Sequence, residues 1–180
     1  MSLLKVNAIQ NIAGEERFGP VLMTQVTASG TSVDFTGIPS WAKRVTVMFN
    51  GVSTSGASIP MIQLGSSSGV ETTGYSGQGD SFTGSGAAIN VVTSTANSIG
   101  FNLSSSITPS STSTLFGLAT LVKFSGNTWV LGSYNSQILA GTGAGTGSKN
   151  LSGTLDRIRI TTVNGTDTFD AGTINLMLEG

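Results

Sequence analysis

Two runs near the end of the chain alternate between apolar and polar positions. In residues 157–161, Ile158 and Ile160 alternate with arginine and threonine, and in residues 173–178 every second residue is isoleucine or leucine. Side chains along a strand point to opposite faces in turn, so each run has one apolar face and one solvated face. A loop rich in Asn, Gly and Asp, residues 164–170, separates them. The two runs are therefore predicted to be antiparallel neighbours in one sheet.

The rest of the domain contains nine further strand-like runs and no run with the 3.6-residue period of a helix. These runs are residues 21–29, 32–35, 44–52, 61–64, 70–75, 87–92, 99–103, 115–124 and 128–139. Turn residues recur between them, and the Ser- and Gly-rich segments 76–86 and 141–147 are predicted to be flexible loops. The pattern predicts an all-β fold, an antiparallel two-sheet sandwich or jelly roll.

The run 115–124 is apolar at nearly every position, in contrast to its neighbours. Such a strand is either central and buried on both faces, or it lies at a contact between subunits. Trp41, in a tight connection after Pro39, is predicted to cap one end of the sandwich over the strand 44–52.

The first twenty residues differ from the rest. A short strand over residues 4–9, with Leu4 and Val6 on one side and Ile9 on the other, precedes the polar segment AGEERFGP. We expect residues 1–20 to form an N-terminal attachment arm and residues 21–180 to form the β-sandwich domain. A lone strand has unpaired edges, so Leu4, Val6 and Ile9 are candidate assembly residues; a frayed terminus is the alternative.

The composition reduces the number of function classes that the chain can belong to. Only 9% of residues are charged, against about 25% in ordinary domains, while 38% are hydrophobic and the net charge is −1. A near-neutral surface rich in Ser, Thr and Gly favours assembly. The 8 basic residues are scattered, which argues against nucleic-acid binding. No run reaches the roughly 18–20 apolar residues of a membrane helix, so no membrane insertion is expected. No secretory signal is recognised, so synthesis in the cytoplasm is expected.

Candidate chemistry is sparse. Without His or Cys, the chain cannot build a Ser-His-Asp or Cys-His nucleophile or a thiolate metal site. Two carboxyls suffice for a glycosidase, but no pair of acids in the sequence suggests a cleft. GTGAGTG, residues 141–147, fits neither the P-loop nor the dinucleotide-binding spacing. The chain is therefore expected not to be an enzyme and to need no cofactor.

One loop and a set of aromatic residues are candidates for a binding role. Asp167 and Asp170 in NGTDTFD could supply oxygen ligands to Ca²⁺, although the segment lacks the spacing of a recognised calcium loop and such residues also bond their own backbone in turns. Tyr75, Phe82 and Tyr134 could help to bind a host-surface glycan or protein receptor, or could only be packing.

Four stretches carry a resemblance to a known family. They are LLKVNAIQN at 3–11, DFTGIPSWAKRVTVMFNGVSTSG at 34–56, IQLGSSSGVETTGY at 62–75 and LDRIRITTVNGTDTFDAGTINLMLE at 155–179. They resemble small β-sandwich proteins of tailed-bacteriophage virions, especially chains of the tail-fibre type. The resemblance implies a structural role without catalytic residues, and an attachment role for residues 3–11.

The resemblance implies a virion structural protein, made in the host cytoplasm, that assembles as a homotrimer with other phage virion proteins and meets the host surface. The sequence lacks a long repetitive shaft or a separate tip, which leaves a second hypothesis open. In that hypothesis the chain is a capsid decoration (cement) protein whose arm adds a strand to a shell subunit. A carbohydrate-active enzyme on the same scaffold is the third hypothesis.

Overall fold

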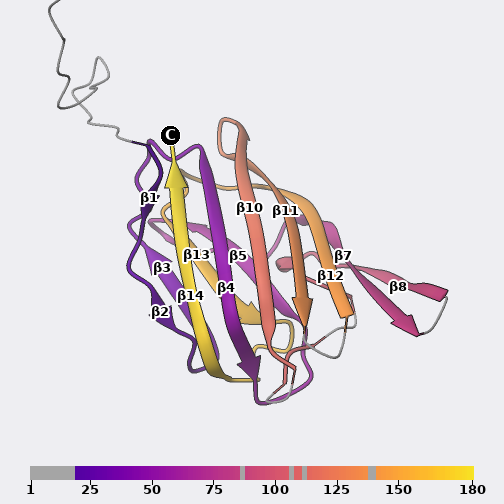
Figure 1. Ribbon diagram of the computed structural model, residues 1–180. Helices are drawn as coiled ribbons and strands as arrows, with labels where there is room; N and C mark the ends of the chain where they lie inside the picture. Colours follow the sequence, from indigo (N-terminus) through magenta and orange to yellow (C-terminus); the bar gives the residue numbers. More distant parts are fainter. Residues whose placement is uncertain (1–18, 86–87, 106–107, 111–112, 138–140) are drawn as a thin grey trace, which may run out of the picture.

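The computed structural model describes residues 19–180 except 86–87, 106–107, 111–112 and 138–140, and of residues 83–96 only the backbone (Figure 1). The described residues form fourteen strands and no helix. The strands are β1 Val21–Leu22, β2 Val26–Thr27, β3 Ser32–Thr36, β4 Arg44–Thr54, β5 Pro60–Ser66, β6 Gly69–Val70, β7 Tyr75–Ser85, β8 Ala88–Ala96, β9 Phe101–Asn102, β10 Leu115–Ser125, β11 Thr128–Gln137, β12 Gly141–Asn150, β13 Arg157–Thr162 and β14 Phe169–Glu179.

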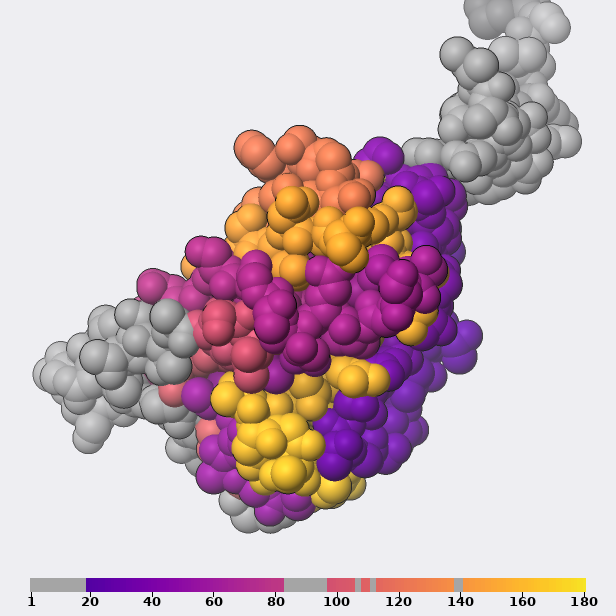
Figure 2. Space-filling view, turned by 180° about the vertical axis from the view of Figure 1, so that it is seen from behind, coloured from indigo at the N-terminus to yellow at the C-terminus, as the bar shows by residue number. Residues whose placement is uncertain are grey.

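The strands form two antiparallel sheets packed face to face. The nine-stranded sheet has the order β1-β14-β4-β10-β11-β12-β7-β8, with β2 also paired to β14. The five-stranded sheet has the order β3-β13-β5-β6, with β9 paired to β5. The larger sheet lies in front in Figure 1, and β3 and β13 lie side by side on the opposite side of the molecule in Figure 2. The predicted all-β, two-sheet sandwich is confirmed, whereas the jelly-roll connection stays a prediction.

The core forms where the inner faces of the two sheets meet. Alternation along β4, β14 and β13 places every second side chain there, as their sequences predict. Fully buried members from the two sheets are Val45, Val47, Leu115, Leu121, Leu131, Ile174 and Leu176, and Ile62, Leu64, Ile158 and Ile160. Trp41 is partly buried against this core, and its predicted place over the strand 44–52 stays a prediction.

The prediction that the two closing runs are neighbours in one sheet is wrong. β13 pairs with β3 and β5, whereas β14 pairs with β4, β1 and β2 in the other sheet. The connecting loop turns on Asn164, whose Oδ1 accepts hydrogen bonds from the backbone N–H of Thr166 at 3.0 Å and of Asp167 at 3.1 Å. Since both edges of β13 are occupied, the chain crosses to the opposite sheet.

The prediction that residues 76–86 and 141–147 are flexible loops is also wrong. Residues 75–85 form β7 and residues 141–150 form β12, and these two strands pair with each other. Glycine in a strand often marks the close approach of another backbone, and here residues 101–104 lie against the glycines of β7 and β12. A Cβ at Gly145 would overlap the carbonyl oxygen of Asn102, and one at Gly143 would lie 2.9 Å from the carbonyl oxygen of Leu103.

The predictions for the individual hairpins are confirmed in part. β10 and β11 form a hairpin around residues 125–127, as expected. β5 and β6 form the expected hairpin, but it ends at Val70, and Tyr75 already begins β7 in the other sheet. The arm residues Leu4, Val6 and Ile9 lie outside the described residues. Within the described part of the chain, no helix is long and apolar enough to cross a membrane.

Replacing Gly145 with Ala should destabilise the sandwich, because the added methyl group forces residues 101–104 away from β12. Overpacking of this kind costs about 1–3 kcal/mol, which corresponds to a fall of about 3–10 °C in Tm for a domain of this size. Gly132→Ala is the matched control, since a Cβ at Gly132 meets no atom within 4 Å. Thermal unfolding followed by circular dichroism checks both variants, and an equal Tm for Gly145→Ala and the wild type would contradict the close approach.

Candidate assembly surface

Large apolar side chains are exposed along the outer face of β10 and β11. We call this set the apolar stripe, and its members are Phe116, Leu118, Val122 and Phe124 on β10 and Val130 and Tyr134 on β11. Leu118 is 53% exposed, Tyr134 67% and Phe124 76%. The opposite face of β10 buries Leu115, Ala119 and Leu121 in the core. Burial of β10 on both faces within one chain is therefore excluded.

The register makes the apolar stripe continuous across the strands. Leu118 pairs with Met48 of β4 on one side and with Tyr134 of β11 on the other. Val122 pairs with Val130. Directly opposed side chains on one face have Cβ atoms about 4.5–5.5 Å apart, which is within contact distance for residues of this size. The register thus gives two apolar pairs across β10 and β11, with Thr120 opposite Gly132 in the row between them. Exposed apolar groups of this kind on single chains mark interaction sites.

On β4, β10, β11 and β12, charged side chains lie at one end of this face, and Asp80 of β7, opposite Ala144 of β12, lies on the same side of the sheet. Arg44, beside Val122 in the register, lies 3.8 Å from Glu179 between Nε and Oε2, and Lys43 and Lys123 lie in the same corner. Further along, the outward positions of β4, β10, β11 and β12 that the structure describes carry Thr, Ser, Asn, Met and the stripe residues. The middle of the face can therefore be covered without burying an ion.

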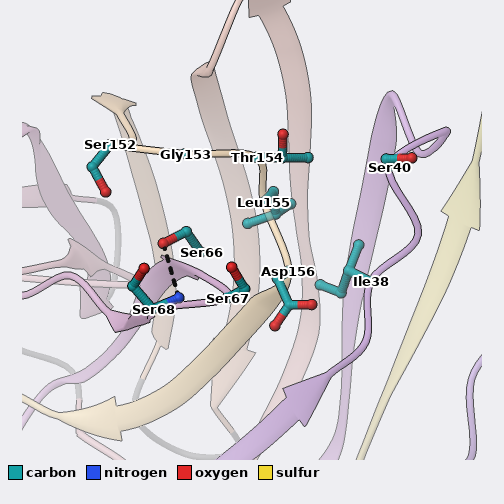
Figure 3. Close-up of a pocket in the computed structure, with 10 residues that line it drawn as sticks. All are labelled: Ile38, Ser40, Ser66, Ser67, Ser68, Ser152, Gly153, Thr154, Leu155 and Asp156. Carbon is teal, nitrogen blue, oxygen red and sulfur yellow. Dashed lines mark hydrogen bonds between the residues drawn. The ribbon is translucent and has the colours of Figure 1, made fainter.

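A recess of about 400 Å³ opens beside the β5–β6 turn (Figure 3). Its hydroxyl groups come from Ser40, Ser66, Ser67, Ser68, Ser152 and Thr154. Asp156 is the one acid among its described lining residues, and its carboxylate accepts a hydrogen bond from Nη2 of Arg157 at 3.1 Å. The recess offers hydroxyl groups to a polar ligand. It does not offer the pair of carboxyls that glycoside hydrolysis uses.

Most acids with described contacts are held by cations or by turns. Asp34 accepts two hydrogen bonds of 2.7 Å from Arg159, an interaction that raises the pKa of that guanidinium. Asp167 accepts hydrogen bonds of 2.8 Å from the backbone N–H of Ser58 and from Nδ2 of Asn164. Asp170 accepts one from the hydroxyl of Ser53. No group of three His, Cys, Asp or Glu that could hold a metal occurs in the described part of the chain.

A polar cluster joins the two sheets beside β7. Lys149 of β12, only 6% exposed, forms an ion pair of 2.6 Å with Glu71, and its Nζ lies 5.4 Å from the centre of the Tyr75 ring. The Tyr75 hydroxyl accepts a hydrogen bond of 2.6 Å from the backbone N–H of Leu64 in the opposite sheet and donates one of 2.9 Å to the Glu71 carbonyl. Glu71 also accepts hydrogen bonds from the backbone and hydroxyl of Ser152. The cluster therefore has a structural role, because these contacts connect β7 and β12 of the larger sheet to β5 and to the segment after β6.

The pKa values in this cluster follow from its contacts. Burial raises the pKa of Glu71, but the hydrogen bonds from Lys149 and Ser152 outweigh burial, so the pKa lies below the ordinary value of 4.5. Burial raises the pKa of Tyr75 well above its ordinary value of 10.0. Tyr75 is therefore a neutral hydrogen-bonding group at physiological pH.

Of the three aromatic residues that the sequence proposes for recognition, only Tyr134 is exposed. Tyr75 is buried and Phe82 is half-buried. The structure pairs Tyr134 with Leu118 on the neighbouring strand, a pairing that the sequence reasoning missed. The available signal was the run 115–124, whose apolar residues on both faces are typical of a subunit contact.

Comparisons of this chain with protein-family models, curated proteins and solved structures gave no match.

The pH dependence of stability should reveal the Glu71–Lys149 pair. Because the pKa of Glu71 is lower in the folded than in the unfolded chain, its contribution is complete above pH 4.5 and is lost as the pH falls through the folded pKa. Glu71→Gln leaves Lys149 unpaired and should lower Tm by about 3–6 °C near neutral pH. The difference from the wild type should shrink as the pH falls below 4.5 and through the lowered pKa of Glu71, because the wild type then loses the carboxylate too.

Glu179→Gln is the control for this series, since the Arg44–Glu179 pair is more exposed and exposed pairs contribute about 0–1 kcal/mol. Calorimetry from about pH 3 to pH 7 checks the expectation. A Tm difference between Glu71→Gln and the wild type that does not change with pH would show that Glu71 does not act through its charge.

Proposed function

We propose that this chain is a structural protein of a bacteriophage virion, a component of the tail-fibre type that works as a homotrimer and is exposed to the host surface. The observation that supports this proposal most is the apolar stripe on the outer face of β10 and β11. The resemblance of four stretches of the sequence to tail-fibre-type chains supports it independently.

The apolar stripe favours an assembling protein on energetic grounds. Fully burying a Val, Leu or Phe side chain stabilises by roughly 1.5–3 kcal/mol, so covering one that is about half exposed contributes on the order of 1 kcal/mol. Six such residues give on the order of 6 kcal/mol for each copy, before the entropic cost of association. A protein that works alone gains nothing from these side chains at its surface.

The exposure to the host surface is supported by the polar character of the remaining surface. The recess of Figure 3 presents six hydroxyl-bearing residues on the side of the β5–β6 turn, away from β10 and β11 in the strand order. Hydroxyl groups on the loops at the end of a sandwich can exchange hydrogen bonds with a glycan or with the backbone of a protein receptor. The two candidate surfaces are therefore separate, and assembly leaves the recess open.

A specific observation favours capsid decoration as the second candidate. β1 forms one edge of the nine-stranded sheet, is only two residues long, and exposes the side chains of both Val21 and Leu22. Residues 1–20 precede this edge in the sequence, and a segment in that position can add a strand to a neighbouring protein. The decoration role uses this edge, whereas the fibre role uses the apolar stripe.

Sedimentation of the purified chain at micromolar concentration should give the mass of three copies, and labelling of intact particles should place the chain at the tail. A strict monomer in solution would contradict the homotrimer. Saturable binding to empty capsids that is lost when residues 1–12 are removed, with label on the head, would favour decoration over the tail. The chain without residues 1–12 should still sediment as a trimer if the apolar stripe drives assembly.

A further inference from the structure

We infer that copies of this chain pack against one another through the apolar stripe, around an axis that runs along the strands, with Leu118 and Tyr134 at the centre of the contact. The inference rests on the proposed homotrimer and names the surface that forms it. The occupant of the stripe is a second copy of the same chain.

The position of the stripe within the sheet supports this arrangement. β10 and β11 are flanked by β1, β14 and β4 on one side and by β12, β7 and β8 on the other, so the stripe follows the middle of the sheet. Strands lie about 4.8 Å apart and rise about 3.3 Å per residue, so the stripe is roughly 10 Å wide and 26 Å long. A long, narrow apolar band parallel to the strands fits an axis in the same direction better than a broad face-to-face contact.

The area of the surrounding face is sufficient for a stable contact. The five strands from β14 to β12 cover roughly 24 Å by 33 Å, or about 800 Å², on their outer side. A standard protein interface buries about 800 Å² on each partner. Threonine and serine residues flank the stripe on β12, among them Thr146 and Ser148. They can form the polar rim that typically surrounds an apolar centre.

Charge favours another copy of this chain over a partner of different chemistry. The centre of the face carries no charged side chain among its described residues, and a strongly acidic or basic partner would gain no complementary ion there. At the end of the stripe, Arg44 and Glu179 supply one charge of each sign within the same copy. When copies meet around an axis along the strands, their equivalent ends lie at the same height. Arg44 of one copy can then form an ion pair with Glu179 of the next copy.

Leu118→Arg and Tyr134→Arg test the inference, because each places a charge in the centre of the contact. Both residues are exposed in the single chain, so the variants should fold, and circular dichroism with thermal unfolding verifies this. Val163→Arg is the matched control, since Val163 is also exposed but follows β13 in the other sheet. Leu118→Ser provides a milder second variant.

The wild type and Val163→Arg should sediment as trimers at the same concentrations. Leu118→Arg and Tyr134→Arg should raise the concentration for half-dissociation at least about thirty-fold, the size of effect seen for central interface residues. The chain contains no cysteine, so single cysteines can be introduced cleanly. A short bis-maleimide should cross-link copies of Thr120→Cys, which lies between Leu118 and Val122, and should not cross-link Val163→Cys.

The other possible outcomes would contradict the stripe contact, the homotrimer or both. A wild type that stays monomeric overturns the inference and the homotrimer together, and leaves a virion role through other proteins. Trimers that persist in folded Leu118→Arg and Tyr134→Arg overturn the inference alone, and the homotrimer stands on another surface. Dimers in place of trimers overturn the homotrimer and the threefold axis. Trimers that are lost only when residues 1–18 are removed assign the assembly to the arm and overturn the role of the stripe.

Discussion

Each strand of a two-layer sandwich can give only one of its two faces to the core. In β4 and β14 the sequence follows this constraint, because hydrophobic residues fill the inner positions and mainly polar residues the outer ones. β10 departs from it, since Leu115, Ala119 and Leu121 already occupy the inner positions when Leu118 and Val122 appear on the outer side. Folding of one chain cannot bury these outer residues. The outer face of β10 therefore carries apolar surface that only another molecule can cover.

A second constraint is the thickness of the sandwich beside β7 and β12. Sheets normally pack about 10 Å apart because side chains fill the space between them. Where Gly143 and Gly145 have no side chain, the backbone of residues 101–104 lies directly on the sheet. The Tyr75 hydroxyl and the Glu71–Lys149 pair then hold β7 and β12 to the smaller sheet close to this thin region. The sandwich is therefore closely packed at a place where its sequence suggests loops.

The features predicted from the sequence are those that depend on local alternation. The phases of β4, β13 and β14 and the turn at residues 125–127 follow from period-2 patterning and turn chemistry, and the fold class follows from them. The sheet to which β13 and β14 belong does not follow, because a short turn rich in Asn and Gly suits a hairpin and a crossing between sheets equally. The strands β7 and β12 were missed since glycine has a low preference for strands, and only a distant backbone segment explains its use here.

The candidate surface could be predicted in part. The two-sided apolar run 115–124 indicates either a buried strand or a subunit contact, and only the strand order decides between them. Tyr134 belongs to the same patch because of its register with Leu118, a relation that no local pattern contains. The arm residues Leu4, Val6 and Ile9 lie outside the described residues, so their role remains a prediction.

The place of β14 has a consequence for how the protein is made. β14 lies between β4 on one side and β1 and β2 on the other, so three early strands acquire their common partner only when residues 169–179 leave the ribosome. Pairings between such distant segments form slowly, and strand edges that wait for them are prone to aggregate. The edge of β4 that β14 covers, and the strands β1 and β2, therefore stay without this partner until the last part of the sandwich has been synthesised.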